Sequence, residues 1–273
     1  MIKSNCHTHT VYCDGKNTAR EMIEAAIDKG FVSLGFSCHS PMIYENDWAI
    51  NKDEIKDYLE EIHALKKEYS DRIDILCGVE ADKDYSDINF RDFDYAIGSV
   101  HQFIKGTAVY EIDLSAERLS EAVDCLFGGD VYRMSECYFN MVADFICQNT
   151  FEVVGHFDLI TKFNEKSALL DENNPLYQKS ALNAVDRILN YNKEILFEVN
   201  TGAMFRKGNK KPYPAPFIME HLHKRSAKIT ITSDAHCCEA LDFAFENAAE
   251  YCKSFGFENS YILTGDGIKM IRL

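Results

Sequence analysis

Residues 2–9 read Ile2-Lys3-Ser4-Asn5-Cys6-His7-Thr8-His9, a short strand-like run that ends in two histidines. Side chains on a β-strand alternate between its two faces, so His7 and His9 should point the same way. Near the other end of the chain, Ile229-Thr230-Ile231-Thr232-Ser233-Asp234-Ala235-His236 repeats the arrangement with Asp234 and His236, provided that the strand extends that far. Nitrogen and oxygen donors paired on one face suit a metal ion, so both stretches predict metal ligands.

Three other histidines serve as an internal control. His221 and His223 have the same spacing as the first pair, but they lie in a stretch with a helical pattern, residues 217–225. Positions two apart on a helix diverge by about 200°, so these side chains should not converge. His63 also falls in a predicted helix. We predict ordinary surface or packing roles for all three.

Short apolar runs alternate with amphipathic stretches along the whole chain, with no low-complexity linker between them. This order is typical of an α/β protein with a parallel sheet and helices outside it. The predicted strands are 2–9, 33–39, 73–81, 94–102, 152–158, 195–200 and 229–235, and the predicted helices are 19–29, 52–69, 116–127, 131–148, 177–192, 214–225 and 239–255. Seven strands favour a single-domain barrel or near-barrel over residues 1–273, with a two-helix excursion at about 115–148.

Composition excludes several classes of protein. The net charge of −15, from 29 basic and 44 acidic residues, opposes binding to DNA or RNA, which depends on cations that neutralise phosphates. There is no apolar run of about 18 residues and no cationic, apolar leader, so we expect no membrane association and a cytoplasmic location. The ten cysteines are scattered, and we expect reduced thiols.

In a barrel of this kind, catalytic groups collect at the carboxyl ends of the strands. Six predicted strands end in residues that can bind a metal: His7 with His9, His39, Glu80, His101, His156, and Asp234 with His236. One such histidine alone is more often a hydrogen-bonded structural residue, but six strand ends together favour a single shared centre. Glu80, among apolar neighbours, is expected to bridge ions rather than to be a solvated acid.

Asp14 lies in the turn Cys13-Asp14-Gly15-Lys16, and Asp-Gly is a common turn pair. Its place in the first βα loop also puts it over the rim, so the roles of turn residue and ligand are compatible. Cys6 and Cys38 should face away from the neighbouring histidines, into packing. The donors are then nitrogen and oxygen only, which suits Zn²⁺, Mn²⁺ or Fe²⁺ without choosing among them.

These residues carry a resemblance to a known family. His7-Thr8-His9 with Asp14, followed by His39, Glu80, His101, His156 and Ser233-Asp234-Ala235-His236, resembles the PHP family, named for polymerase and histidinol phosphatase. The chain length, the two-helix excursion and the loop from Val199 to Gly208 leading to Pro212-Tyr213-Pro214 are similar to stand-alone histidinol-phosphatases.

The resemblance implies a distorted (β/α)7 barrel, similar to a TIM barrel, with three divalent metal ions. Carried over residue by residue, the first ion is expected at His7, His9, Glu80 and Asp234, the second at Glu80, His101 and His156, and the third at Asp14, His39 and His236. Glu80 would bridge the first two.

The implied activity is hydrolysis of a phosphate monoester, above all L-histidinol phosphate in histidine biosynthesis, by attack of a hydroxide that bridges two metal ions. Asp14, Glu80 and His236 are the expected catalytic residues, and proton delivery to the leaving oxygen is left open between the third ion's water, Asp14 and His236. Arg206 and Lys162 are expected to contact the phosphate. Lys207, Lys210 and Lys211 are interpreted as hydrated surface.

Two other functions are compatible with the residues. One is a PHP phosphoesterase that acts on another small phosphate ester or on nucleic-acid ends, although the acidic surface opposes the latter. The other is a metal-binding protein without catalysis, which the complete set of ligands opposes. The sequence leaves the oligomeric state open.

Overall fold

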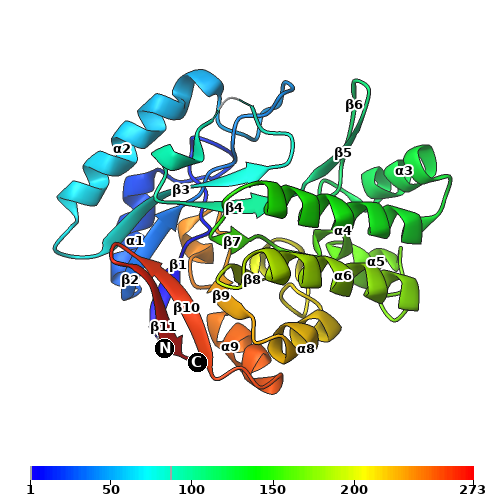
Figure 1. Cartoon of the computed structure of the whole chain (residues 1–273). Helices are drawn as coiled ribbons and strands as arrows, with labels where there is room; N and C mark the ends of the chain where they lie inside the picture. Colours follow the sequence, from blue (N-terminus) through cyan, green and yellow to red (C-terminus); the bar gives the residue numbers. More distant parts are fainter. Residues whose placement is uncertain (1, 87) are drawn as a thin grey trace.

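The structure is a computed structural model that describes residues 2–86 and 88–273. At its centre is a seven-stranded parallel sheet, in which neighbouring strands follow the order of the chain (Figure 1). The strands are β1 (Lys3–Asn5), β2 (Phe31–Phe36), β3 (Asp74–Asp82), β4 (Tyr95–Ser99), β7 (Val153–Val154), β8 (Leu196–Asn200) and β9 (Lys228–Thr232). All seven predicted strands are present, so the α/β barrel prediction is confirmed.

The sheet curls into a nearly closed barrel with its seam between β1 and β9. Beyond the ends of these strands, Thr8 and Ala235 form an isolated parallel bridge. The His9 amide donates to the Ala235 carbonyl at 2.8 Å, and the Ala235 amide donates to the His7 carbonyl at 3.1 Å. The barrel therefore closes at its carboxyl end, which is the end that carries the histidines.

Helices cover the outside of the barrel (Figure 1). They are α1 (Ala19–Asp28), α2 (Ile55–Glu68), α3 (Ala116–Phe127), α4 (Val131–Gln148), α6 (Pro175–Tyr191), α8 (Pro216–Lys224) and α9 (Phe245–Ser254), with the short helices α5 (Asn164–Ser167) and α7 (Gly202–Lys207) above the rim. The helices of the excursion, α3 and α4, have the predicted bounds. Gly128, at a φ of 64°, ends α3, and the Asp130 side chain caps the first amides of α4.

The interior of the barrel is filled by a small apolar cluster around Tyr95. The Tyr95 hydroxyl lies 2.6 Å from the Cys6 carbonyl and 3.1 Å from the Phe36 carbonyl, and it can donate a hydrogen bond to either of them. A Cβ atom at Gly35 or Gly78 would lie 2.3 Å from the Tyr95 side chain, so the barrel can hold this ring only because both positions are glycine. Burying such a ring contributes about 1.5–3 kcal/mol of stability.

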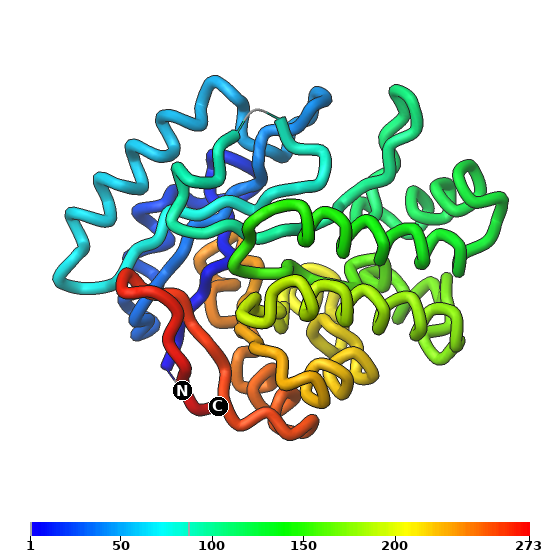
Figure 2. Tube along the Cα trace, in the orientation of Figure 1, coloured from blue at the N-terminus to red at the C-terminus, as the bar shows by residue number. Residues whose placement is uncertain are grey.

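Two hairpins were not predicted. β10 (Asn259–Thr264) and β11 (Gly267–Arg272) pair through a two-residue loop, Gly265-Asp266. Figure 2 shows this hairpin, in red, beside β1 and β2 at the end of the barrel where the two termini lie. Leu263 of β10 joins the cluster inside the barrel, and the Ser33 hydroxyl donates to its carbonyl at 2.7 Å. The hairpin therefore helps to close the end of the barrel opposite to the histidines.

The second hairpin, β5 (Gln102–Lys105) with β6 (Ala108–Glu111), directly follows β4. The predicted strand 94–102 was therefore too long, and so were those predicted at 2–9, 152–158 and 229–235. In each case the chain leaves the hydrogen-bonded ladder before its metal-type residue, at the start of the βα loop. All ten cysteines are free thiols, as predicted. In the described ranges, no helix combines the length and apolar character needed to cross a bilayer.

Candidate metal centre

Glu80 lies at the centre of a ring of imidazoles at the carboxyl end of the barrel. It comes from β3, is 1% exposed, and points both carboxylate oxygens into the ring. Its Oε2 lies 2.9 Å from His39 Nδ1, 3.2 Å from His7 Nε2 and 3.6 Å from His9 Nε2. Its Oε1 lies 2.9 Å from His156 Nε2 and 3.4 Å from His101 Nε2. One carboxylate thus faces five imidazoles from four strand ends, the geometry expected of a bridging ligand.

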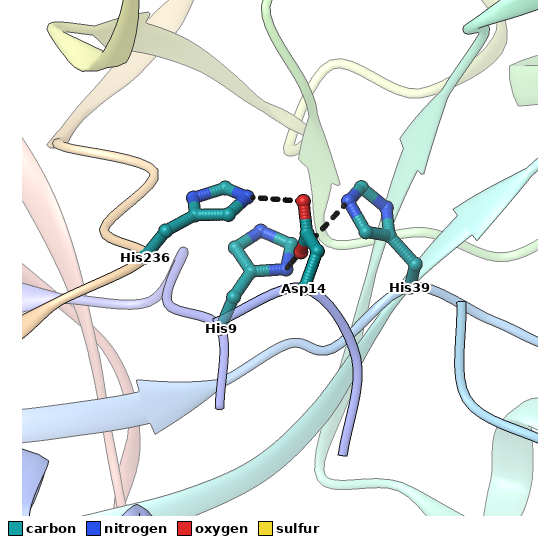
Figure 3. A group of neighbouring side chains, drawn as sticks. All are labelled: His9, Asp14, His39 and His236. Atoms are coloured by element: carbon teal, nitrogen blue, oxygen red, sulfur yellow. Dashed lines mark ion pairs between the residues drawn. The ribbon is translucent and has the colours of Figure 1, made fainter. Parts of the chain in front are cut away.

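A second group forms around Asp14, as Figure 3 shows. Asp14 Oδ2 lies 3.0 Å from His236 Nε2, and Oδ1 lies 3.7 Å from both His39 Nε2 and His9 Nδ1. The rings of His9 and His236 stack at 4.1 Å. His9 therefore adjoins this group as well as the group around Glu80, whereas the resemblance had assigned it to the first ion alone.

Asp234, two residues beyond the end of β9, completes the set. Its Oδ1 lies 3.3 Å from His9 Nε2, 3.5 Å from His236 Nδ1 and 3.8 Å from His7 Nε2. The strand alternation that suggested this position was wrong: β9 ends at Thr232, and Asp234 has a φ of 50°, in the left-handed region. The side chain reaches the centre because the backbone turns there. All nine predicted ligands nevertheless converge.

The residues fit divalent metal ions. Four sets of three or four donor atoms lie within 4.8 Å of one another: His9, Asp14, His39 and His236; His7, Glu80 and His156; His7, His9 and Asp234; and His39, Glu80 and His101. In the part of the chain that the structure describes, four buried atoms facing this ring make no hydrogen bond: His7 Nε2, His9 Nε2, His39 Nδ1 and Glu80 Oε2. Buried polar atoms are normally satisfied, so these four indicate metal ligation.

The Glu80 carboxylate and the surrounding imidazoles shift one another's pKa values. Burial lowers the pKa of His39, but the nearby Glu80 carboxylate outweighs burial and raises that pKa to about 9. The pKa of His101 is likewise lowered by burial and raised to about 9 by Glu80 and Asp82. Burial raises the pKa of Glu80, yet the imidazoles of His7 and His39 bring it well below its usual value. The carboxylate is thus ionised, and protons compete with metal ions for the imidazoles.

Two carboxylates that the sequence analysis missed hold the histidines in place. Glu198, in β8, has Oε1 2.5 Å from His7 Nδ1 and accepts a 2.6 Å hydrogen bond from the His156 amide through Oε2. Asp82, in β3, has Oδ2 2.8 Å from His101 Nδ1. Such contacts fix the orientation and tautomer of a ligating imidazole and make it a stronger ligand.

Both missed residues left a signal in the sequence. Asp82 stands two positions after Glu80, on the same face of one strand. Glu198 is a lone charged residue between Phe197 and Val199 in a fully buried strand, where an unpaired carboxylate would be costly.

Seven of the nine metal-type residues, all but His7 and His9, form the floor of a cavity of about 170 Å³. Its wall includes Asp113, Leu159, Lys162, Arg206 and Lys207. The cavity thus holds both residues expected to contact phosphate. Lys162 is 6% exposed, and its Nζ lies 2.8 Å from Asp113 Oδ2. Arg206, in α7, places Nη2 2.6 Å from Asp234 Oδ2. Lys207 also lines the cavity, so its interpretation as hydrated surface was wrong.

The three control histidines lie outside the centre, as predicted. His63 is exposed on α2. His221 Nε2 lies 2.7 Å from Asp186 Oδ1 on the outside of the barrel, and the His223 ring packs 5.2 Å from that of Phe257.

Comparisons with known proteins show which family and fold the chain shares. The PHP domain profile matches residues 5–202. The chain is 31% identical to a probable histidinol-phosphatase of Deinococcus radiodurans over 260 residues, covering 92% of each protein. Among solved structures, a putative histidinol phosphatase from Listeria monocytogenes superposes with a TM-score of 0.73 at 19% identity, covering 90% of this chain and 99% of the other.

A histidinol phosphate phosphatase from Lactococcus lactis, solved with zinc, L-histidinol and phosphate, superposes with a TM-score of 0.64 at 19% identity and covers 98% of each chain. At this identity the two solved structures bear on the fold. The profile match and the Deinococcus relative go further, because each spans most of the chain. The protein therefore belongs to the PHP domain family.

Proposed function

We propose that this protein is a metal-dependent phosphatase that hydrolyses L-histidinol phosphate to L-histidinol and phosphate. One observation carries the proposal: the cavity above the Glu80 ring also presents Arg206 and Lys162. A site with ionised carboxylates and imidazoles on its floor and cations on its wall suits a small phosphorylated molecule bound beside metal ions. The names of the relatives, and the histidinol and phosphate of the Lactococcus protein, support this substrate.

We further propose three divalent ions, Zn²⁺, Mn²⁺ or Fe²⁺, held by the nine converging residues. When bound, such ions activate water and neutralise the negative charge of the phosphoryl group. Glu80 would bridge two of them, because its two oxygens face different sets of imidazoles. Glu198 and Asp82 would keep His7 and His101 oriented toward the ions.

The residues around the ions would bind the substrate and help to deliver a proton to its departing oxygen. The planar guanidinium of Arg206 can contact two phosphate oxygens at once, and Lys162 adds a charge from the neighbouring loop. The Asp14 and His236 side chains lie 3.0 Å apart at the rim, and both would be ligands of the third ion. As ligands they would not carry the proton themselves, so we propose that they position a water molecule that protonates the departing oxygen of the alcohol, which would otherwise leave as an unstable alkoxide.

The test is a comparison of substrates on the protein loaded separately with Zn²⁺, Mn²⁺ and Fe²⁺. Phosphate release would be measured from L-histidinol phosphate, from a generic aryl phosphate and from DNA with a 3′-phosphate. We expect the highest kcat/KM with L-histidinol phosphate. Preference for DNA or for the generic ester would reject this substrate, and no turnover in a fully loaded sample would favour a non-catalytic metal-binding protein.

A further inference from the structure

Lys207 is the last residue of α7 and stands directly after Arg206 at the cavity wall. Gly208 follows with a φ of 73° and ends the helix. The side chain is half-buried, unlike the exposed Lys210 in the same loop. Lys207 is thus part of the cavity and not of the open surface.

The three cations of the wall differ in their partners. Arg206 is paired with Asp234, and Lys162 is paired with Asp113. Over residues 2–86 and 88–273, Lys207 forms no ion pair, and its ammonium lies 5.4 Å from the centre of the Phe163 ring. In a protein with 44 acidic and 29 basic residues, a half-buried lysine without a carboxylate partner is unexpected.

The position is also electrostatically unfavourable for a cation. Burial lowers the pKa of Lys207, and the neighbouring charges of Lys162 and Arg206 lower it further, by more than the Asp113 carboxylate raises it. A bound anion would reverse this penalty, because it would give all three cations a common partner.

We propose that Lys207 binds phosphate and completes, with Arg206 and Lys162, a subsite of three cations for the phosphoryl group of the substrate and for the inorganic phosphate product. This rests on the proposed function only in taking phosphate as the anion. Arg206 offers a fixed fork, whereas the flexible lysine stem lets the ammonium follow the phosphoryl group as its bond to the alcohol breaks. Because Lys207 has no carboxylate to leave, it can bind phosphate without first losing an ion pair.

The experiment compares Lys207→Met with Lys210→Met. Methionine keeps the apolar stem over Phe163 and removes the charge, while the control removes a charge from the same loop outside the cavity. Binding of inorganic phosphate to the metal-loaded protein would be measured by titration calorimetry. We expect Lys207→Met to weaken this binding roughly tenfold or more, the size expected for a hydrogen bond between charged groups.

Lys207→Arg should restore most of the phosphate affinity, because it restores the charge. In Lys207→Met, KM for the ester should rise with little change in kcat, and the melting temperature of the metal-free protein should not change. Wild-type phosphate affinity in Lys207→Met, or an equal loss in Lys210→Met, would overturn the proposal. Calorimetry with inorganic phosphate gives this answer even if L-histidinol phosphate proves not to be a substrate, so the two proposals fail separately.

Discussion

The guanidinium of Arg206 lies against the carboxylate of Asp234, with Nη2 2.6 Å from Oδ2 and Nη1 3.1 Å from Oδ1. Nη1 also donates to the Asp234 carbonyl at 2.8 Å. A Cβ at Gly202 would lie 2.9 Å from Arg206 Nη2, so this close approach requires a glycine at the start of α7. The residue proposed to bind phosphate is thereby held against a proposed metal ligand.

Replacing Arg206 by alanine should chiefly weaken substrate capture. We expect KM for the phosphate ester to rise roughly ten- to a hundredfold, because a charged contact to phosphate is lost, while metal content stays the same. Steady-state kinetics and elemental analysis would check this. Arg20→Ala, which breaks an exposed pair with Glu68, is the matched control. Unaltered KM and kcat would make Arg206 a bystander.

Glu80→Gln should remove at least two metal ions and nearly all activity. An amide oxygen carries no net charge and bridges two cations poorly, and Glu80 faces imidazoles on both sides. Elemental analysis of the purified variant measures the loss directly. Glu60→Gln, exposed on α2, tests whether losing any carboxylate has this effect. Full metal content with normal turnover would show that Glu80 does not bridge.

Glu198→Gln should weaken metal binding by roughly ten- to a hundredfold without removing a ligand, the usual cost of losing an outer partner of a ligating histidine. The change keeps the shape of the side chain but not the charge that faces His7 Nδ1. Competition with a chelator would measure the affinity, and circular dichroism would verify the fold. Wild-type metal affinity in this variant would mean that Glu198 has only a structural role in the barrel.

The metal-free protein should lose stability as the pH rises from about 6.5 to about 9. The folded-state pKa of both His39 and His101 is raised to about 9, against an unfolded value near 6.5. A raised pKa contributes stability that is complete below the unfolded value and is lost as the pH passes the folded value. Urea unfolding in the presence of a chelator, at a series of pH values, would show the decline.

The decline should be smaller in a variant with both histidines replaced by asparagine. It should also be smaller in the metal-loaded protein, where the imidazoles are ligands and carry no titrating proton. An equal slope in wild type and variant would assign the pH dependence to other groups.

Trp48 should report metal binding by fluorescence. It is the single tryptophan of the chain, and its ring lies 4.9 Å from that of His39 and 6.2 Å from that of His101. Adding ions to the metal-free protein should change the emission until the sites near these rings are filled. His39→Gln should reduce the change. An emission that ignores saturating metal would show that His39 and His101 do not bind ions in solution.

The sequence predicted the parallel barrel and the meeting of the strand-end donors at one rim because both follow from simple periodicities, whereas Asp14 was expected there from its place in the first βα loop. Apolar runs alternating with amphipathic stretches imply parallel strands, and parallel strands deliver their last residues to one rim. The backbone conformation of Asp234 could not be predicted in this way. Asp234 has a left-handed backbone directly before Ala235, which bridges to Thr8, and this contact between opposite ends of the chain is not visible in the local sequence.

Other omissions had a visible cause. Gly265-Asp266-Gly267 between apolar residues is a hairpin signal, but the stretch follows the last predicted helix and was left unassigned. Glu198 was interpreted only as part of a strand, because its position in the sequence does not show that its partner, His7, comes from the end of β1, across the seam between β1 and β9. Lys207 was interpreted together with Lys210 and Lys211 as one hydrated lysine run. In the structure Gly208 ends the helix between them, and Lys207 lines the cavity whereas Lys210 does not.

The bridge between Thr8 and Ala235 gives the metal ions a mechanical role. His7 and His9 flank one side of this seam, and Asp234 and His236 flank the other. Ions held by these four side chains would cross-link the first βα loop to the last, at a place where the backbone contributes only a short bridge of two hydrogen bonds. Removal of the ions by a chelator should therefore open the barrel locally at this seam before the rest of the protein unfolds. The amide hydrogens of His9 and Ala235 should then be the earliest to exchange with solvent.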